Sequence, residues 1–166
     1  MEDTALPTNA PYAFELAVER IRAASAAARA LPHDFVLVAR ADGVMNGTYD
    51  LEEGLRRIRA FDAAGADCLY IPCPSSPEDL RIICAATSKP VNALAFGAFT
   101  KLSQVEFGKL GVARISLGSS LARATHKLIH DAAAAMFEDG NFKSLSQGIS
   151  GTEIDAAMAK GAARPS

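Results

Sequence analysis

The chain has 166 residues, with 17 Lys and Arg against 19 Asp and Glu, a net charge of −2 and a hydrophobic share of 49%. The lack of a basic surplus argues against a nucleic-acid partner, and the apolar share is enough for a packed core. No apolar run is long enough to cross a bilayer and the acidic start is unlike a signal peptide, so we expect a cytoplasmic protein without a membrane partner. Three cysteines without metal-ligand spacing are typical of reduced, mostly buried thiols.

The first part of the chain predicts one helix and one strand after a loop. Residues 1–11 are rich in turn-forming residues and are typical of a loop. Apolar residues then recur at helical spacing over 14–31 and predict an amphipathic helix that ends before Pro32. The run at 35–39 is continuously apolar and favours β-structure, so we expect a strand that is covered on both faces.

The rest of the chain repeats this alternation of strand and helix. A helix is predicted over 51–61, and we expect its exposed side to carry the pairs Glu52/Arg56 and Glu53/Arg57. Further strands are predicted at 68–71, 91–96 and 114–117, and further helices from 76, over 101–110 and over 119–137. A weak helix over 152–160 and a frayed tail complete the pattern.

A run of strand–helix units requires a parallel sheet with right-handed crossovers, which is an α/β fold. Two architectures accept such a run: an open doubly wound sheet, and part of a (β/α)8 barrel. No Gly-x-Gly-x-x-Gly segment follows a strand, which disfavours the dinucleotide-binding version of the open sheet. Both architectures place function at the carboxyl ends of the strands, so polar residues there are the candidates.

Arg40 and Asp42 are the first such candidates, because they end an apolar strand. A guanidinium is costly to desolvate unless it meets an anion, and its fork suits a carboxylate or phosphonate ligand. The alternative is that Arg40 pairs with Asp42 as a structural contact. Asn92 lies among apolar residues of a strand, where its amide either bonds across the sheet or contacts a substrate.

Other polar residues favour plainer roles. Ser119 follows a strand and is expected to cap the next helix, although such a turn can also bind an anion. Cys73 has no histidine nearby in sequence and is interpreted as a packing thiol. His126 and His130 have a spacing that permits metal binding, yet they lie opposite the apolar helix face, so an exposed or subunit-facing pair is favoured.

Five segments occur in an order that resembles one enzyme superfamily. They are 1–3 (MED), 35–42 (FVLVARAD), 63–67 (AAGAD), 89–92 (KPVN) and 111–118 (GVARISLG). Together they are similar to the isocitrate lyase/phosphoenolpyruvate mutase superfamily, above all its bacterial 2-methylisocitrate-lyase-like branch. The resemblance implies a (β/α)8 barrel that binds Mg2+ and a small α-keto or α-hydroxy carboxylic acid. It also implies cleavage of a C–C or P–C bond through an enolate.

The resemblance also assigns roles to particular residues. Glu2 matches the acidic residue that helps to hold Mg2+, usually through water, and Arg40 matches the catalytic arginine that grips the substrate anion. Asn92 belongs to the matching "PVN" strand and is a substrate-binding candidate. The segments that carry the main metal aspartates in the family would precede residue 1, so residues 1–145 resemble a C-terminal barrel portion of about five strands. Residues 146–166 are then a weak helix and tail.

Two function hypotheses follow from this pattern. The first is a truncated, Mg2+-dependent lyase or mutase that is weak or inactive alone and either forms a homo-oligomer or needs an N-terminal half. The second is a non-catalytic oligomerisation or binding module that uses chiefly the helix over 119–137. An independent open-sheet binding protein is a third possibility.

Overall fold

A computed structural model describes residues 1–162, and its chain forms two compact units, Met1–Gly118 and the residues from Ser119 onward. The predicted tail at 163–166 lies outside the described residues. The boundary predicted after residue 145 falls within the short 3-10 helix η2 (Lys143–Gln147).

The first unit begins with a small hairpin that the sequence had predicted as loop. Strands β1 (Thr4–Ala5) and β2 (Ala10–Pro11) pair antiparallel. Helix α1 (Phe14–Arg29) follows and buries Ala17, Ile21 and Ala28. The apolar spacing of the sequence therefore placed the helix correctly.

Four short parallel strands form the framework of this unit. Strand β3 (Val38–Arg40) pairs with β4 (Cys68–Tyr70), and β5 (Asn92–Leu94) pairs with β6 (Arg114–Ser116). A parallel bridge between Leu69 and Val91 joins the two pairs, and a second bridge sets Glu2 beside Arg40. Neighbours in space thus follow the order of the chain, with no reversal among the described strands. Within residues 1–162 the strands do not close into a barrel.

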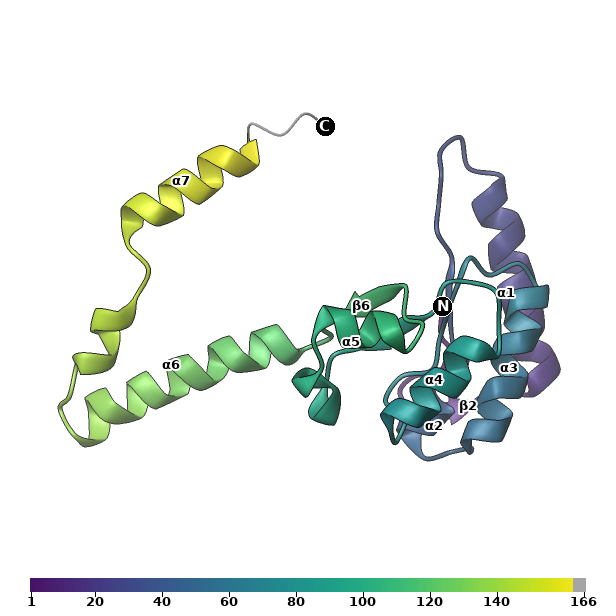
Figure 1. The fold of residues 1–166 in the computed structure, drawn as a ribbon, viewed down its shortest axis with the longest axis horizontal. Helices are drawn as coiled ribbons and strands as arrows, with labels where there is room; N and C mark the ends of the chain where they lie inside the picture. The colour runs from purple at the N-terminus through teal and green to yellow at the C-terminus, as the bar shows by residue number, and fades with distance from the viewer. Residues whose placement is uncertain (163–166) are drawn as a thin grey trace. The chain divides into compact units, whose positions relative to one another are not determined.

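Helices connect these strands and cover one side of them. The helices are α2 (Gly43–Asn46), α3 (Leu51–Ala63), α4 (Pro77–Ala85) and α5 (Gln104–Lys109), with the 3-10 helix η1 (Gly97–Lys101) before α5. Asp50, Ser76 and Ser103 cap α3, α4 and α5 by accepting hydrogen bonds from backbone N–H groups of the first turn. Helices α1 and α3 pack side by side (Figure 1).

The two faces of the strands differ in character. Leu37, Ala39, Leu69 and Val91 point to the helix-covered face, where they form the core with residues such as Phe61 of α3. The alternate positions, among them Arg40 and Tyr70, point to the opposite face. Because side chains alternate along a strand, this opposite face is where the structure gathers its polar groups.

The prediction of a strand over 35–39 with both faces covered is wrong in two respects. The strand starts three residues later, at Val38, and Phe35 and Val36 are 49% and 67% exposed. The hydrophobic run marked the strand but not its register, because a continuous apolar stretch carries no alternation that fixes where pairing begins.

The second unit consists of helix α6 (Ser120–Glu138), η2 and helix α7 (Gly151–Ala162). The predicted helices over 119–137 and 152–160 are confirmed within one or two residues. Neither helix has a buried residue. Within the described residues, no helix combines the length and apolar character that a membrane span requires.

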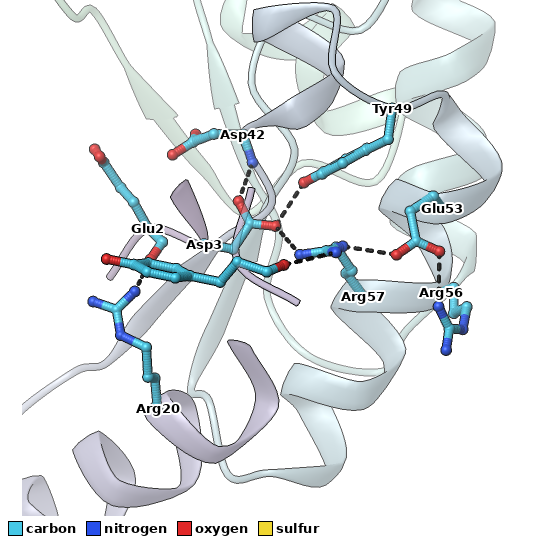
Figure 2. Close-up of polar contacts among 9 residues, drawn as sticks. Glu2, Asp3, Arg20, Asp42, Tyr49, Glu53, Arg56 and Arg57 are labelled. Atoms are coloured by element: carbon cyan, nitrogen blue, oxygen red, sulfur yellow. Dashed lines mark hydrogen bonds and ion pairs between the residues drawn. The ribbon is translucent and has the colours of Figure 1, made fainter. Parts of the chain in front are cut away.

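The buried carboxylate of Asp3 links the start of the chain to the segment after β3 and to α3 through hydrogen bonds (Figure 2). Asp3 is 2% exposed and accepts three hydrogen bonds: from the backbone N–H of Asp42 (2.8 Å), the Tyr49 hydroxyl (2.7 Å) and the Arg57 guanidinium (3.0 Å). Asp42, the second residue after β3, is therefore positioned by a side chain that is distant in sequence.

Arg57 lies at the centre of this contact, contrary to its predicted place on the exposed side of α3. It is 5% exposed and donates to Asp3, to Glu53 (2.8 Å) and to the Tyr12 carbonyl (3.1 Å). Burial favours a raised pKa for the Glu53 carboxyl, but hydrogen bonds and charge from Arg56 and Arg57 together outweigh it and lower that pKa. The predicted Glu53/Arg57 pair thus forms, but as part of a buried network.

Replacing Asp3 tests how much this network contributes to stability. Asp3→Asn keeps the shape of the side chain but leaves the buried Arg57 cation without its full counter-charge, so we expect a loss of about 3–5 kcal/mol in the free energy of unfolding. Tyr49→Phe removes one hydrogen bond only and should cost about 1 kcal/mol. Urea unfolding measures both. An unchanged urea midpoint for Asp3→Asn would contradict the role of this carboxylate.

The lowered pKa of Glu53 predicts a pH-dependent contribution. A carboxyl with a lowered native pKa stabilises the fold above its unfolded value of 4.5, and this stabilisation is lost as the pH falls through the native pKa. Glu53→Gln should therefore cost about 1–2 kcal/mol at pH 7 and progressively less below pH 4.5. Urea unfolding across this pH range measures the difference. Glu52→Gln is the control, because Glu52 is exposed and lies in the same helical turn. If Glu53→Gln loses the same free energy of unfolding at pH 7 as below pH 4.5, the pH-dependent contribution of Glu53 is refuted.

Candidate functional site

Arg40 ends strand β3 on the polar face, where the sequence predicted a functional residue. Its Nε and Nη2 donate to Asp42 Oδ1 at 3.1 and 2.8 Å, and its Nη1 lies 3.0 Å from Glu2 Oε1. The guanidinium also lies over the Tyr70 ring, 5.2 Å from its centroid. A guanidinium has five N–H donors, so these carboxylate contacts leave donors free for a further acceptor.

Two carboxylates, those of Asp42 and Glu2, pair with Arg40. Asp42 is 1% exposed and Glu2 is partly exposed, and the Met1 ammonium is a second cation near both carboxylates. Burial raises the pKa of Asp42, although the Arg40 charge and hydrogen bond counteract that rise. The structural interpretation of Arg40, as a partner of Asp42, is therefore confirmed as a contact.

A concavity of about 390 Å³ lies on the polar face of the strands. Residues from all four parallel strands line it: Val38, Arg40, Tyr70, Asn92, Leu94, Arg114 and Ser116, together with Met1, Met45 and Gly118 from outside the strands. Each strand residue among them occupies an alternate position, so this part of the lining follows directly from the strand register. The arrangement places hydroxyl, amide and guanidinium groups around one hollow, which suits a small polar ligand.

Asn92 lies in this lining and is only 1% exposed. Its Nδ2 donates to Ser116 Oγ at 2.9 Å, and its Oδ1 accepts from Arg114 Nη1 at 2.7 Å. These contacts supply the cross-sheet hydrogen bonds that one interpretation of Asn92 predicted. Contact with a substrate stays a prediction.

Tyr70, Arg114 and Ser116 are site residues to which the sequence interpretation gave no role. Burial raises the pKa of the Tyr70 phenol, against the charge of Arg40 and a hydrogen bond with Ser116. Burial likewise raises the pKa of the Cys68 thiol, against the charge of Arg114, which places that charge near β4. The available sequence signal was the alternation of side chains along the strand segments CLY and RIS. This alternation places Tyr70, Arg114 and Ser116 on one face of the strands.

Glu2, the predicted metal partner, pairs with Arg40 and is not among the residues that line the concavity. Within the described residues, no group of three or more His, Cys, Asp or Glu side chains could hold a metal ion. Mg2+ requires a near-octahedral set of oxygen ligands. The carboxylates near the concavity do not supply such a set, so the residues described do not by themselves fit a magnesium site.

The remaining candidates stay outside this site. Ser119 occupies the N-cap position of α6, as predicted, but its side chain makes no capping hydrogen bond. Cys73 is a partly buried free thiol with a φ of 53°, and burial raises its pKa, which disfavours a nucleophilic thiolate. His126 and His130 are exposed on α6, as expected.

Comparison with known proteins shows which family this chain resembles. The model of the phosphoenolpyruvate phosphomutase family matches residues 1–137. A 2-methylisocitrate lyase of Shewanella oneidensis is 28% identical over 141 residues, which are 84% of this chain and 47% of that protein. The chain thus spans about half the length of this curated relative.

Solved structures agree with this result. A protein of Burkholderia cenocepacia J2315 that is provisionally assigned as a lyase/mutase has 36% identity and a TM-score of 0.89, covering 96% of this chain and 58% of that one. Phosphonopyruvate hydrolase in complex with oxalate and Mg2+ has 26% identity and a TM-score of 0.75, covering 99% of this chain and 61% of that one. On the family match, the chain belongs to the phosphoenolpyruvate phosphomutase family, within the isocitrate lyase/phosphoenolpyruvate mutase superfamily.

Proposed function

We propose that this chain supplies the anion-binding face of a lyase-type or mutase-type site for small α-keto or α-hydroxy carboxylic acids. The reaction cleaves a C–C or P–C bond beside a carboxylate and passes through an enolate. The observation that carries this proposal is the polar concavity, with Arg40 at the carboxyl end of β3. The strand order without reversal supports a further part of the proposal, that the strands are a portion of a (β/α)8 barrel.

In this proposal Arg40 binds and orients the substrate anion. The Asp42 and Glu2 contacts hold the guanidinium in one direction, and its remaining N–H groups face the ligand. Fixed donors beside an enolate stabilise the charge that develops there, without needing to reorganise during the reaction. Asn92 borders the same hollow and is proposed as a substrate-binding residue.

Mg2+ is the cofactor that the family resemblance implies, and Glu2 is proposed as one outer partner of it. When bound, the ion would polarise the oxygen atoms of the substrate. Since the residues described do not form a full ligand set, the proposal includes ligands from outside residues 1–162. One acidic residue cannot retain Mg2+, so we expect this chain alone to be weak or inactive in turnover.

Oxalate binding tests the role of Arg40, because oxalate and Mg2+ occupy the related phosphonopyruvate hydrolase. We expect the chain to bind oxalate in calorimetric titration. Arg40→Gln should weaken this binding about tenfold or more, because it removes charge-assisted hydrogen bonds to the ligand. Arg81→Gln is the matched control, because Arg81 is an exposed arginine of α4 that pairs with Glu78.

Two results would contradict this proposal. One is a wild-type chain that does not bind oxalate with or without added Mg2+. The other is an Arg40→Gln variant that binds oxalate as well as the Arg81→Gln control. Circular dichroism of both variants shows whether either substitution disturbs the fold.

A second candidate function is a homo-oligomerisation module, which the exposed apolar residues of α6 favour. Leu121 and Leu128 are seven residues apart on this helix, and both are exposed, as is Ile129. Residues at this spacing share one helix face, and an exposed apolar face of this kind is typical of an interface. We propose a second copy of this chain as the occupant of this face.

Sedimentation velocity tests the oligomer. We expect the wild-type chain to self-associate, and the double variant Leu121→Lys/Leu128→Lys to shift to monomer because it places two charges in the apolar interface. Arg123→Gln, on the same helix, should leave the sedimentation coefficient unchanged. A wild-type chain that sediments as a monomer at all concentrations would exclude this function.

A further inference from the structure

The two arginines that line the concavity differ in their counter-charges. Arg40 contacts two carboxylates, those of Glu2 and Asp42. Arg114 contacts the neutral Asn92 amide, and within residues 1–162 the structure gives it no carboxylate partner. Arg114 is therefore the lining side chain whose positive charge is not already compensated.

The position of Arg114 turns this charge toward the hollow. Arg114 is the first residue of β6, its register partner on β5 is Asn92, and the two side chains meet on the polar face. Only Nη1 is used in the bond to Asn92 Oδ1, at 2.7 Å. Asn92 is itself held by Ser116, so the contact fixes the direction of the guanidinium while leaving its other donors available.

An exposed but oriented guanidinium of this kind is suited to a carboxylate or phosphonate, which it can bind through two parallel hydrogen bonds. Arg40 and Arg114 come from different strands, β3 and β6, and both line the same hollow of about 390 Å³. A ligand with one anionic group satisfies one of them. A ligand with two anionic groups satisfies both.

We infer that Arg114 is a second anion-binding residue of this concavity, and that its ligands are small dianions with one anionic group directed to Arg40 and the other to Arg114. This inference rests on the proposed function and deepens it by assigning a second residue of this chain to the substrate. It also gives Asn92 a positioning role, because Asn92 holds the Arg114 guanidinium.

Malonate and acetate form a matched pair of probes, since acetate lacks only the second carboxylate. Calorimetric or NMR titration of the full chain should show that Arg114→Gln weakens malonate binding about tenfold and acetate binding less than threefold. Arg114→Lys keeps the charge but not the forked guanidinium, so its malonate affinity should lie between those of the wild type and Arg114→Gln. Arg81→Gln is again the control, and Arg40→Gln is measured in parallel.

The outcomes separate this inference from the proposed function. If Arg114→Gln binds malonate as the wild type does while Arg40→Gln does not, Arg114 has no such role and the proposed function stands. If Arg114→Gln weakens malonate and acetate equally, its role is structural and the inference fails. If the wild-type chain binds neither oxalate nor malonate, both proposals fail. A selective loss of malonate binding is the result that supports the inference.

Discussion

The buried carboxylate of Asp3 is the interaction on which the arrangement of this site depends. Three donors from three segments converge on it: the backbone N–H after β3, the hydroxyl of Tyr49 before α3, and Arg57 within α3. A buried ion pair contributes little net stability, because desolvation offsets the attraction, but removal of one partner is costly. The value of this contact is geometric, since it sets the segment of Glu2 beside the end of β3.

From this arrangement follows the environment of Arg40. The bridge between Glu2 and Arg40 brings one carboxylate to the guanidinium, and the backbone bond from Asp42 to Asp3 fixes the residue that supplies the other. Arg40 is thereby held from two sides. Such preorganisation favours the binding of a charge in one position, because little side-chain freedom is lost when the ligand arrives.

The sequence was sufficient to predict the alternation of helices and parallel strands, and the place of Arg40 at a strand end. Both predictions depend on the periodic spacing of apolar residues, which shows which side of a single helix or strand is buried. It could not predict Asp3, because the partner Arg57 is 54 residues away and a lone acidic residue carries no periodic signal. For the same reason Arg57 was expected on the exposed side of α3: a charged residue in a helix is exposed unless a distant partner is known.

The charges around the concavity explain why we propose Arg114 as an anion-binding residue in addition to Arg40. The charge of Arg40 is already compensated by two carboxylates, so Arg40 attracts a further anion less strongly than an unpaired arginine would. The neutral partner of Arg114 leaves its charge available in the same hollow. In the arrangement that we propose, Arg114 therefore supplies most of the charge attraction for an anion at this face, and Arg40 orients the anion through hydrogen bonds.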